Sequence, residues 1–228
     1  MESKKINVTM TNIEFIDELI VLRSNNSLIA KKQIFDLAKK HKNMPTKEVI
    51  KLLRNSDYDQ RLGAVSILDW KARNTKITDK EKAEIYTAYV ENHKWIDDWG
   101  LVDRAAPYVV GGYLYDKDRK PLYKLAMSKL PMERRTAIVS TYYFIRKNDI
   151  QDTFKISEIL VHDQDEYVQM AVGSWIREAG KKNITHLTKF LDKYASTMNR
   201  KCLRYAIEKL DSTSKQKYLN VDSKNAGR

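Results

Sequence analysis

The chain has 228 residues and a formal net charge of +12, and this length fits one domain or one compact array of repeats. Its 7 Gly and 4 Pro are too few for a β-sandwich, a disordered chain or a Gly-rich nucleotide-binding loop. No apolar run reaches the ~18 residues that a membrane span needs. The basic balance favours nucleic acid or another anionic surface as the partner.

Cysteine, histidine and the N-terminal residues indicate the compartment and the kind of site. Cys202 is the single cysteine, so it cannot form an internal disulfide, and the N-terminus lacks the apolar core of a secretory signal. We therefore expect a cytoplasmic protein, associated with the bacterial nucleoid when it is bound to DNA, with Cys202 as a buried thiol. The 4 His are scattered without ligand-like spacing, so no metal site is expected.

Apolar residues recur at spacings of three and four from about Asn12 to Leu219, which predicts an all-α chain with no strand. The termini, residues 1–11 and 220–228, are expected to be frayed. Candidate helix starts are marked by side chains that favour the N-cap: Thr46, Thr78, Asp152 and Thr213.

Four of the predicted helices resemble one another, because each opens with polar or basic residues and then carries a small residue where a neighbouring helix must approach. These helices cover 59–70, 133–144, 166–177 and 199–207, with Ala64, Ala137, Ala171 and Ala206 as the small residues. Their spacing of roughly 33–37 residues, or twice that, is typical of helical-pair repeats. We therefore predict one domain, residues 1–228, built as an α-solenoid of stacked HEAT-like antiparallel helix pairs with a basic concave face.

Trp99 and Asp103 are the most informative pair in the sequence. A spacing of four residues places both side chains on one face of a helix, and the apolar residues around them exclude a fully solvated helix. An indole beside a carboxylate on a basic protein suits a cationic base in a polyanionic polymer. The alternative is that Trp99 belongs to the core and that Asp103 pairs with Arg104 or Arg135.

Several segments together resemble one known family. The strongest are Trp99-Gly-Leu-Val-Asp-Arg-Ala-Ala-Pro107, Arg134-Arg-Thr-Ala-Ile138, Ala171-Val-Gly-Ser-Trp-Ile-Arg-Glu178 and Met198-Asn-Arg-Lys-Cys-Leu-Arg-Tyr-Ala206. In their order and spacing the chain, from about Leu28 to Leu219, resembles the HEAT-like-repeat DNA alkylation repair proteins, the AlkD type of DNA glycosylase. This resemblance implies a monomeric α-solenoid that holds duplex DNA and removes 3-alkyladenine and 7-alkylguanine without a cofactor.

The resemblance also assigns roles to residues. Trp99 and Asp103 match the catalytic pair of the family, and Arg135 matches an Arg that contacts DNA near the lesion. Because Arg binds phosphate in a bidentate manner, further phosphate contacts are expected from residues that share this side chain: Arg61, Arg104, Arg134 and Arg177.

At two positions the chain differs from the family pattern. Ser174 stands where the family carries a second tryptophan of the DNA cleft, and the indole follows one residue later, at Trp175. Because one residue turns a helix by about 100°, Trp175 faces either the core or the groove. We expect Ser174 and Trp175 to take part in DNA binding, with Ser174 opening the groove and Trp175 reaching it. Gly100 replaces the Asp that commonly follows the first Trp.

These differences keep two other functions open. A non-catalytic DNA-binding solenoid that recognises damaged or branched DNA would keep the basic groove without the chemistry. A protein-binding scaffold for an acidic peptide would also explain the positive charge, but it would not require Trp99, Asp103 and Arg135 to occur together.

Overall fold

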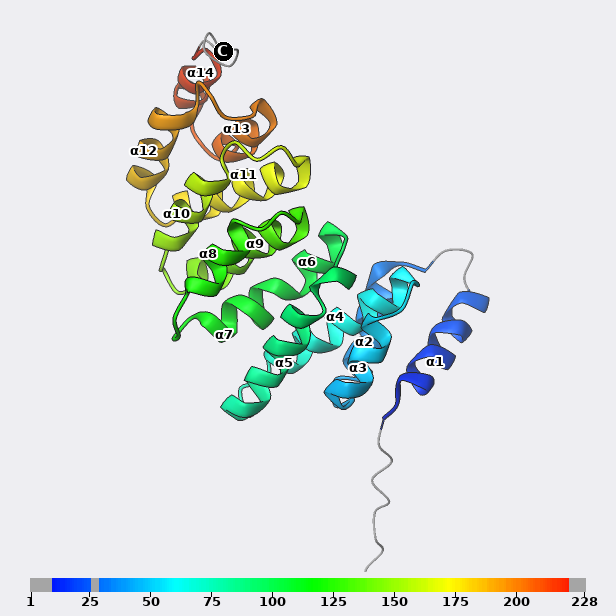
Figure 1. The fold of residues 1–228 in the computed structure, drawn as a ribbon. Helices are drawn as coiled ribbons and strands as arrows, with labels where there is room; N and C mark the ends of the chain where they lie inside the picture. Colours follow the sequence, from blue (N-terminus) through cyan, green and yellow to red (C-terminus); the bar gives the residue numbers. More distant parts are fainter. Residues whose placement is uncertain (1–9, 26–28, 222–228) are drawn as a thin grey trace, which may run out of the picture. The chain divides into compact units, whose positions relative to one another are not determined.

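A computed structural model of the protein describes residues 10–25 and 29–221, and within these ranges the chain forms helices and no strand (Figure 1). The predicted all-α class is therefore confirmed. The helices form two compact units, of which the first runs to Ala105 and the second begins at Ala106. Most of the predicted frayed termini, residues 1–9 and 222–228, lies outside the described residues.

The first unit is built from antiparallel helices around α4. In chain order it contains α1 (Asn12–Ser24), α2 (Lys31–Lys40), α3 (Thr46–Leu53), α4 (Tyr58–Ala72), α5 (Asp79–Glu91), the 3-10 turn η1 (His93–Trp95) and α6 (Trp99–Ala106), which ends at the unit boundary. Helix α4 packs against α2, α3 and α5, and α1 packs against α2 and α3. Apolar side chains of α4 such as Leu62, Val65 and Leu68 are buried by these contacts.

The second unit repeats this arrangement around α9 and α11. It contains the π-helical turn η2 (Pro107–Gly111), α7 (Gly112–Leu114), α8 (Lys120–Ala126), α9 (Pro131–Arg146), α10 (Gln151–Leu160), α11 (Glu166–Gly180), α12 (Ile184–Tyr194), α13 (Arg200–Ile207) and α14 (Ser212–Leu219). Helix α9 packs against η2, α8, α10 and α11, and α11 also packs against α12 and α13.

The four helices that the sequence marks as repeat equivalents are α4, α9, α11 and α13, and their predicted small residues are buried. Ala64, Ala137, Ala171 and Ala206 are each at most 2% exposed. A small side chain at these positions lets a neighbouring helix approach closely.

The predicted helix starts are confirmed at one position and displaced at three. Thr78 is the N-cap of α5 and forms a capping box with Glu81. Thr46, Asp152 and Thr213 lie in the first turn of α3, α10 and α14 instead. In α14 the cap is Asp211, which accepts from the amide of Ser214, because a carboxylate is as good an N-cap as a hydroxyl.

Gly173 marks the closest approach between α11 and α13. A Cβ atom there would lie 2.4 Å from the carbonyl oxygen of Cys202 and 2.7 Å from the Cβ of Tyr205. We expect Gly173→Ala to lower the free energy of unfolding by about 1–3 kcal/mol, since backbone atoms cannot move aside cheaply. Urea unfolding measures this change.

Gly112→Ala is the matched control for that measurement. The nearest atom to a Cβ at Gly112 would be a ring carbon of Tyr143 at 3.4 Å, which is ordinary contact. Alanine also favours the helix over glycine by up to about 1 kcal/mol. Stability should therefore stay constant or rise in this variant, and an equal loss in both variants would contradict the close approach at Gly173.

Cys202 is fully buried in α13, as the sequence predicts. Burial raises the pKa of its thiol to about 12, so the reactive thiolate is scarce at pH 8. We expect the folded protein to be inert towards a chromogenic disulfide reagent at this pH and the guanidinium-unfolded protein to release one equivalent of chromophore. Rapid reaction of the folded protein would show that α13 opens easily.

Among the described residues, no helix is both long and apolar enough to cross a membrane. In the same residues, His, Cys, Asp and Glu form no group of three or more that could hold a metal ion.

Candidate active site

Helix α6 presents Trp99 at its first residue because Asp98 caps the helix. The amide of Gly100 donates to Oδ1 of Asp98 over 2.7 Å, and the hydroxyl of Tyr58 donates to the same oxygen over 3.1 Å. Burial and the charge of Asp98 together raise the pKa of Tyr58 to about 12. Asp98 therefore caps the start of the helix.

Trp99 and Asp103 lie on one face of α6, whereas Leu101, Val102 and Ala105 are fully buried on the other. Trp99 is 39% exposed, so it is not a core residue. Both side chains line a shallow depression of about 300 Å³, which we call the Trp99 depression. Its lining residues come from α2, from α4 and the C-cap of α4, and from α6: Lys31, Phe35, Leu62, Arg73, Trp99, Gly100, Asp103 and Arg104.

Lys31 is a member of this site that the sequence motifs do not reveal. Its Nζ lies 5.0 Å from the centroid of the Trp99 ring, within the range of a cation–π contact. Gly100 leaves room for this ammonium group, because a Cβ there would lie 3.2 Å from Lys31 Nζ and 2.9 Å from the hydroxyl oxygen of Tyr58. The missing side chain at Gly100 thus brings a cation close to the indole.

Arg104 faces inward and forms a buried ion pair. Its Nη1 lies 2.7 Å from Oδ2 of Asp69, a carboxylate with no solvent exposure, and its Nε donates to Oγ of Ser66 over 3.0 Å. Arg73 Nε binds the same Oδ2 over 2.8 Å. Burial raises the pKa of Asp69, while the two guanidinium groups oppose this rise. Arg104 therefore stabilises the interior at the same time as it lines the depression.

Comparison with models of known protein families identifies the family of this chain. A sequence model described as DNA alkylation repair enzyme matches residues 29–210. The chain belongs to this family. Neither a curated protein nor a solved structure matches it.

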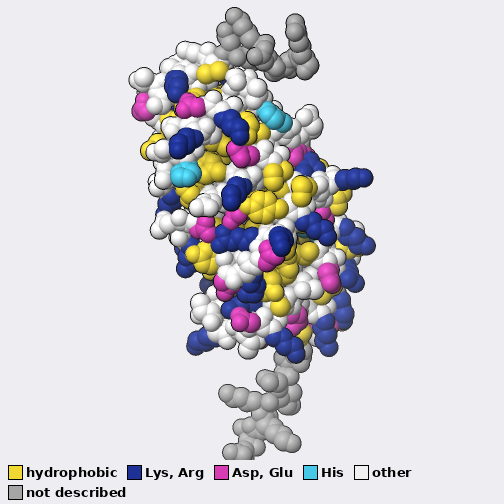
Figure 2. Space-filling model, turned by 60° about the vertical axis from the view of Figure 1, so that its left-hand side comes forward, with side chains coloured by type: hydrophobic (Ala, Val, Ile, Leu, Met, Phe, Trp, Pro, Cys, Tyr) yellow, Lys and Arg dark blue, Asp and Glu magenta, His cyan; other side chains and the backbone are white. Residues whose placement is uncertain are grey.

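As a member of the DNA alkylation repair enzymes, the protein is an enzyme of DNA repair, and its substrate is alkylated DNA. Its surface suits this polyanion, since Lys and Arg side chains spread over much of the face shown in Figure 2, with acidic side chains among them. The family membership does not by itself define which residues act.

Arg61, which the sequence predicts to contact phosphate, is held by hydrogen bonds within the protein. Its Nη1 donates to the carbonyl oxygens of Asn55 over 3.0 Å and Ser56 over 2.8 Å, and its Nη2 donates to Oδ1 of Asp97 over 3.1 Å. These contacts fasten the turn before α4 to the turn before α6. A role of Arg61 in DNA binding stays a prediction.

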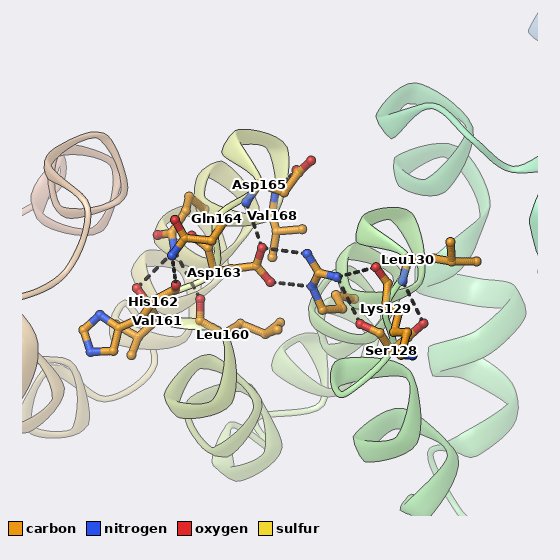
Figure 3. Close-up of polar contacts among 12 residues, drawn as sticks. Ser128, Lys129, Leu130, Leu160, Val161, His162, Asp163, Gln164, Asp165 and Val168 are labelled. Atoms are coloured by element: carbon orange, nitrogen blue, oxygen red, sulfur yellow. Dashed lines mark hydrogen bonds and ion pairs between the residues drawn. The ribbon is translucent and has the colours of Figure 1, made fainter.

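Arg134 makes the equivalent contacts two repeat lengths later, at the start of α9 (Figure 3). Its Nη1 donates to the carbonyl oxygens of Ser128 and Lys129, each over 3.0 Å, and Nε and Nη2 donate to the carboxylate of Asp163 over 2.5 and 2.8 Å. Arg61 and Arg134 thus each bind the carbonyl oxygens of the residues five and six positions before them. Each also binds the carboxylate of an aspartate in the turn before a later helix, Asp97 before α6 and Asp163 before α11. Sequence reasoning recognised both guanidinium groups but missed these acceptors.

The other predicted residues lie in the second unit. Arg135 is 6% exposed and donates to the carbonyl oxygen of Tyr167. Arg177 pairs with Glu178 over 3.1 Å and with Glu208. These partners show what the two arginines contact within the protein, and their predicted phosphate contacts remain to be tested.

Trp175, on α11, lies against an aromatic side chain of α9. Its ring centroid is 4.9 Å from that of Tyr142, and the two planes are tilted by 38°. Trp175 and Ser174 are both half-buried. The indole is therefore packed on one side, and its predicted contact with DNA stays a prediction.

Proposed function

We propose that the protein is a DNA glycosylase that excises cationic alkylated purines, 3-alkyladenine and 7-alkylguanine, from duplex DNA. The observation that carries this proposal is the Trp99 depression, in which an exposed indole and the carboxylate of Asp103 share one open surface. Lys31 and Arg73 line the same depression and supply positive charge for the phosphates that flank a lesion.

The chemistry needs little from the protein, because alkylation at N3 of adenine or N7 of guanine makes the base cationic. The bond between C1′ and the base nitrogen breaks, its electron pair goes to the base, and the base leaves neutral. The sugar is left with positive charge at C1′, to which water adds through its oxygen with loss of a proton. The products are the free base and an abasic site.

Asp103 would act as a fixed anion beside C1′. A preorganised carboxylate stabilises the charge that develops in the transition state, and it can orient the attacking water and accept its proton. Trp99 would pack against the sugar and exclude bulk water, which strengthens the attraction between Asp103 and C1′. Because the site is a shallow depression, bulky lesions should be accepted. Neutral lesions should be poor substrates, because an uncharged base is not activated as a leaving group.

Release of 7-methylguanine from methylated duplex DNA tests this proposal. We expect the wild-type protein to release the free base and to leave abasic sites that alkali cleaves. The same preparation should bind duplex DNA with an affinity that falls with salt, at a slope of about −0.9 in log–log form for each phosphate contacted. Binding without base release would contradict the glycosylase and favour a non-catalytic DNA-binding solenoid.

A further inference from the structure

A second and larger cavity opens at the C-terminal end of α4. It has a volume of about 820 Å³ and lies among the end of α2, the start of α3, the end of α4 and the face of α5. Trp70 lines it, so we call it the Trp70 cavity. The mechanism proposed above does not use it.

The lining of the Trp70 cavity is strongly cationic. Five of its side chains carry positive charge: Lys39, Lys42, Lys71, Arg73 and Lys76. Its two carboxylates are Glu81 and Glu84, and Glu81 is already engaged in capping α5, where it accepts from the amide and the hydroxyl of Thr78.

Three of these cations have no ion-pair partner in the described part of the chain. Lys42 and Lys76 make no side-chain hydrogen bond there, and Lys39 has only the face of Trp70, with Nζ 5.1 Å from the ring centroid. Lys71 is held in the wall, since its Nζ donates to the carbonyl oxygen of Met44 over 2.9 Å. Gathered like charges repel one another, so an anion in the cavity would relieve this repulsion.

A neutral donor adds to the positive lining. The indole Nε1–H of Trp70 is buried and has no acceptor among the described residues, which is unfavourable unless an acceptor is supplied. Pro45 and Thr46 also line the cavity, where α3 begins without a side-chain cap. An oxyanion would supply the acceptor that the indole N–H lacks.

We propose that the Trp70 cavity is a phosphate-binding site. A tetrahedral oxyanion matches a lining that combines ammonium groups with an N–H donor. The phosphate can be presented by the DNA backbone or by a free nucleotide. Arg73 lines both the Trp70 cavity and the Trp99 depression, so a backbone phosphate held here would lie next to the candidate active site.

The indole N–H resonance of Trp70 reports occupancy of this site directly. We would titrate ¹⁵N-labelled protein with inorganic phosphate at constant ionic strength and assign the resonance with Trp70→Phe, since the chain has only 4 Trp. We expect a saturable shift at Trp70 and little change at Trp95. The shift should be lost in the double variant Lys42→Ala/Lys76→Ala.

Lys155→Ala/Lys189→Ala is the matched control, because it removes the same charge from two exposed lysines of the second unit. It should keep the Trp70 shift. An unmoved Trp70 resonance, or equal responses in the two double variants, would overturn the proposal. This readout does not depend on base release, so a failed glycosylase and a failed phosphate site are distinguishable.

Two further titrations identify the source of the phosphate. If the DNA backbone supplies it, Lys42→Ala/Lys76→Ala should weaken duplex binding about tenfold relative to the control pair and reduce the salt slope by about 2. If a free nucleotide supplies it, AMP should shift Trp70 at lower concentration than inorganic phosphate does, and duplex binding should equal that of the control. Either result supports the phosphate site.

Discussion

Asp103→Asn is expected to reduce the rate of 7-methylguanine release from duplex DNA by at least about 100-fold, the usual effect of removing a group that stabilises transition-state charge. Asparagine keeps the size of the side chain but removes the negative charge that we place beside C1′. Single-turnover kinetics with enzyme in excess measure this loss, because they separate bond cleavage from product release.

Asp97→Asn is the control for this variant. Asp97 belongs to the same segment and its side chain is 58% exposed, but it pairs with Arg61 and does not line the Trp99 depression. It should release the base at nearly the wild-type rate. Duplex affinity and thermal unfolding of Asp103→Asn should also stay close to wild type. Full base release by Asp103→Asn would remove the carboxylate from the mechanism.

The Trp99–Asp103 pair could be predicted because it is local. A spacing of four residues on one helix determines that the two side chains share a face, whatever the rest of the chain does. The buried alanines at Ala64 and Ala137 could be predicted for a similar reason, since helical periodicity shows which face must be apolar.

Lys31 could not be predicted, because its place beside Trp99 depends on how α2 packs in the first unit. No spacing in the sequence relates the two residues, and the basic pair Lys31 and Lys32 gives no sign that only the first reaches the indole. Gly100 is the one local clue. Read from sequence alone it is a lost acidic residue, whereas in the structure it is the space that admits the ammonium group.

The partners of the arginines within the protein could not be predicted from the sequence either. Guanidinium groups near helix starts suit phosphate contacts, and sequence patterns give no sign of carbonyl oxygens that compete for them. Arg134 is satisfied by the end of the preceding turn and by Asp163. Such acceptors arise where a helix ends and a chain reverses, and the displaced starts of α10 and α14 show that these ends are the least predictable part of the fold.

Arg104→Met is expected to lower the free energy of unfolding by about 3 kcal/mol at pH 7, because it leaves the buried carboxylate of Asp69 with one partner fewer. Both arginines bind Oδ2 of Asp69, and Oδ1 has no partner among the described residues. Denaturant unfolding measures the loss. Arg177→Met is the control: its partner Glu208 is 46% exposed, and such surface pairs contribute at most about 1 kcal/mol.

The pH dependence identifies Asp69 as the cause. Burial raises the pKa of Asp69 in the folded protein above its unfolded value of 3.8, so its protonated form favours folding and this contribution is lost as pH rises. Without Arg104 the pKa rises further. The difference between Arg104→Met and wild type should therefore be largest near pH 7 and should shrink as pH falls towards the unfolded pKa. An equal difference at both ends of this range would contradict the buried pair.

Asp69→Asn in the Arg104→Met background completes the test, because a neutral side chain no longer needs a cation. The double variant should regain part of the lost stability, and the double-mutant cycle gives the coupling between the two residues. Because Arg104 is paired with Asp69, the loss of Arg104 should affect base release far less than the loss of Asp103. We expect less than a tenfold decrease at temperatures well below the unfolding transition, which would separate the residue that supports the depression from the one that acts in it.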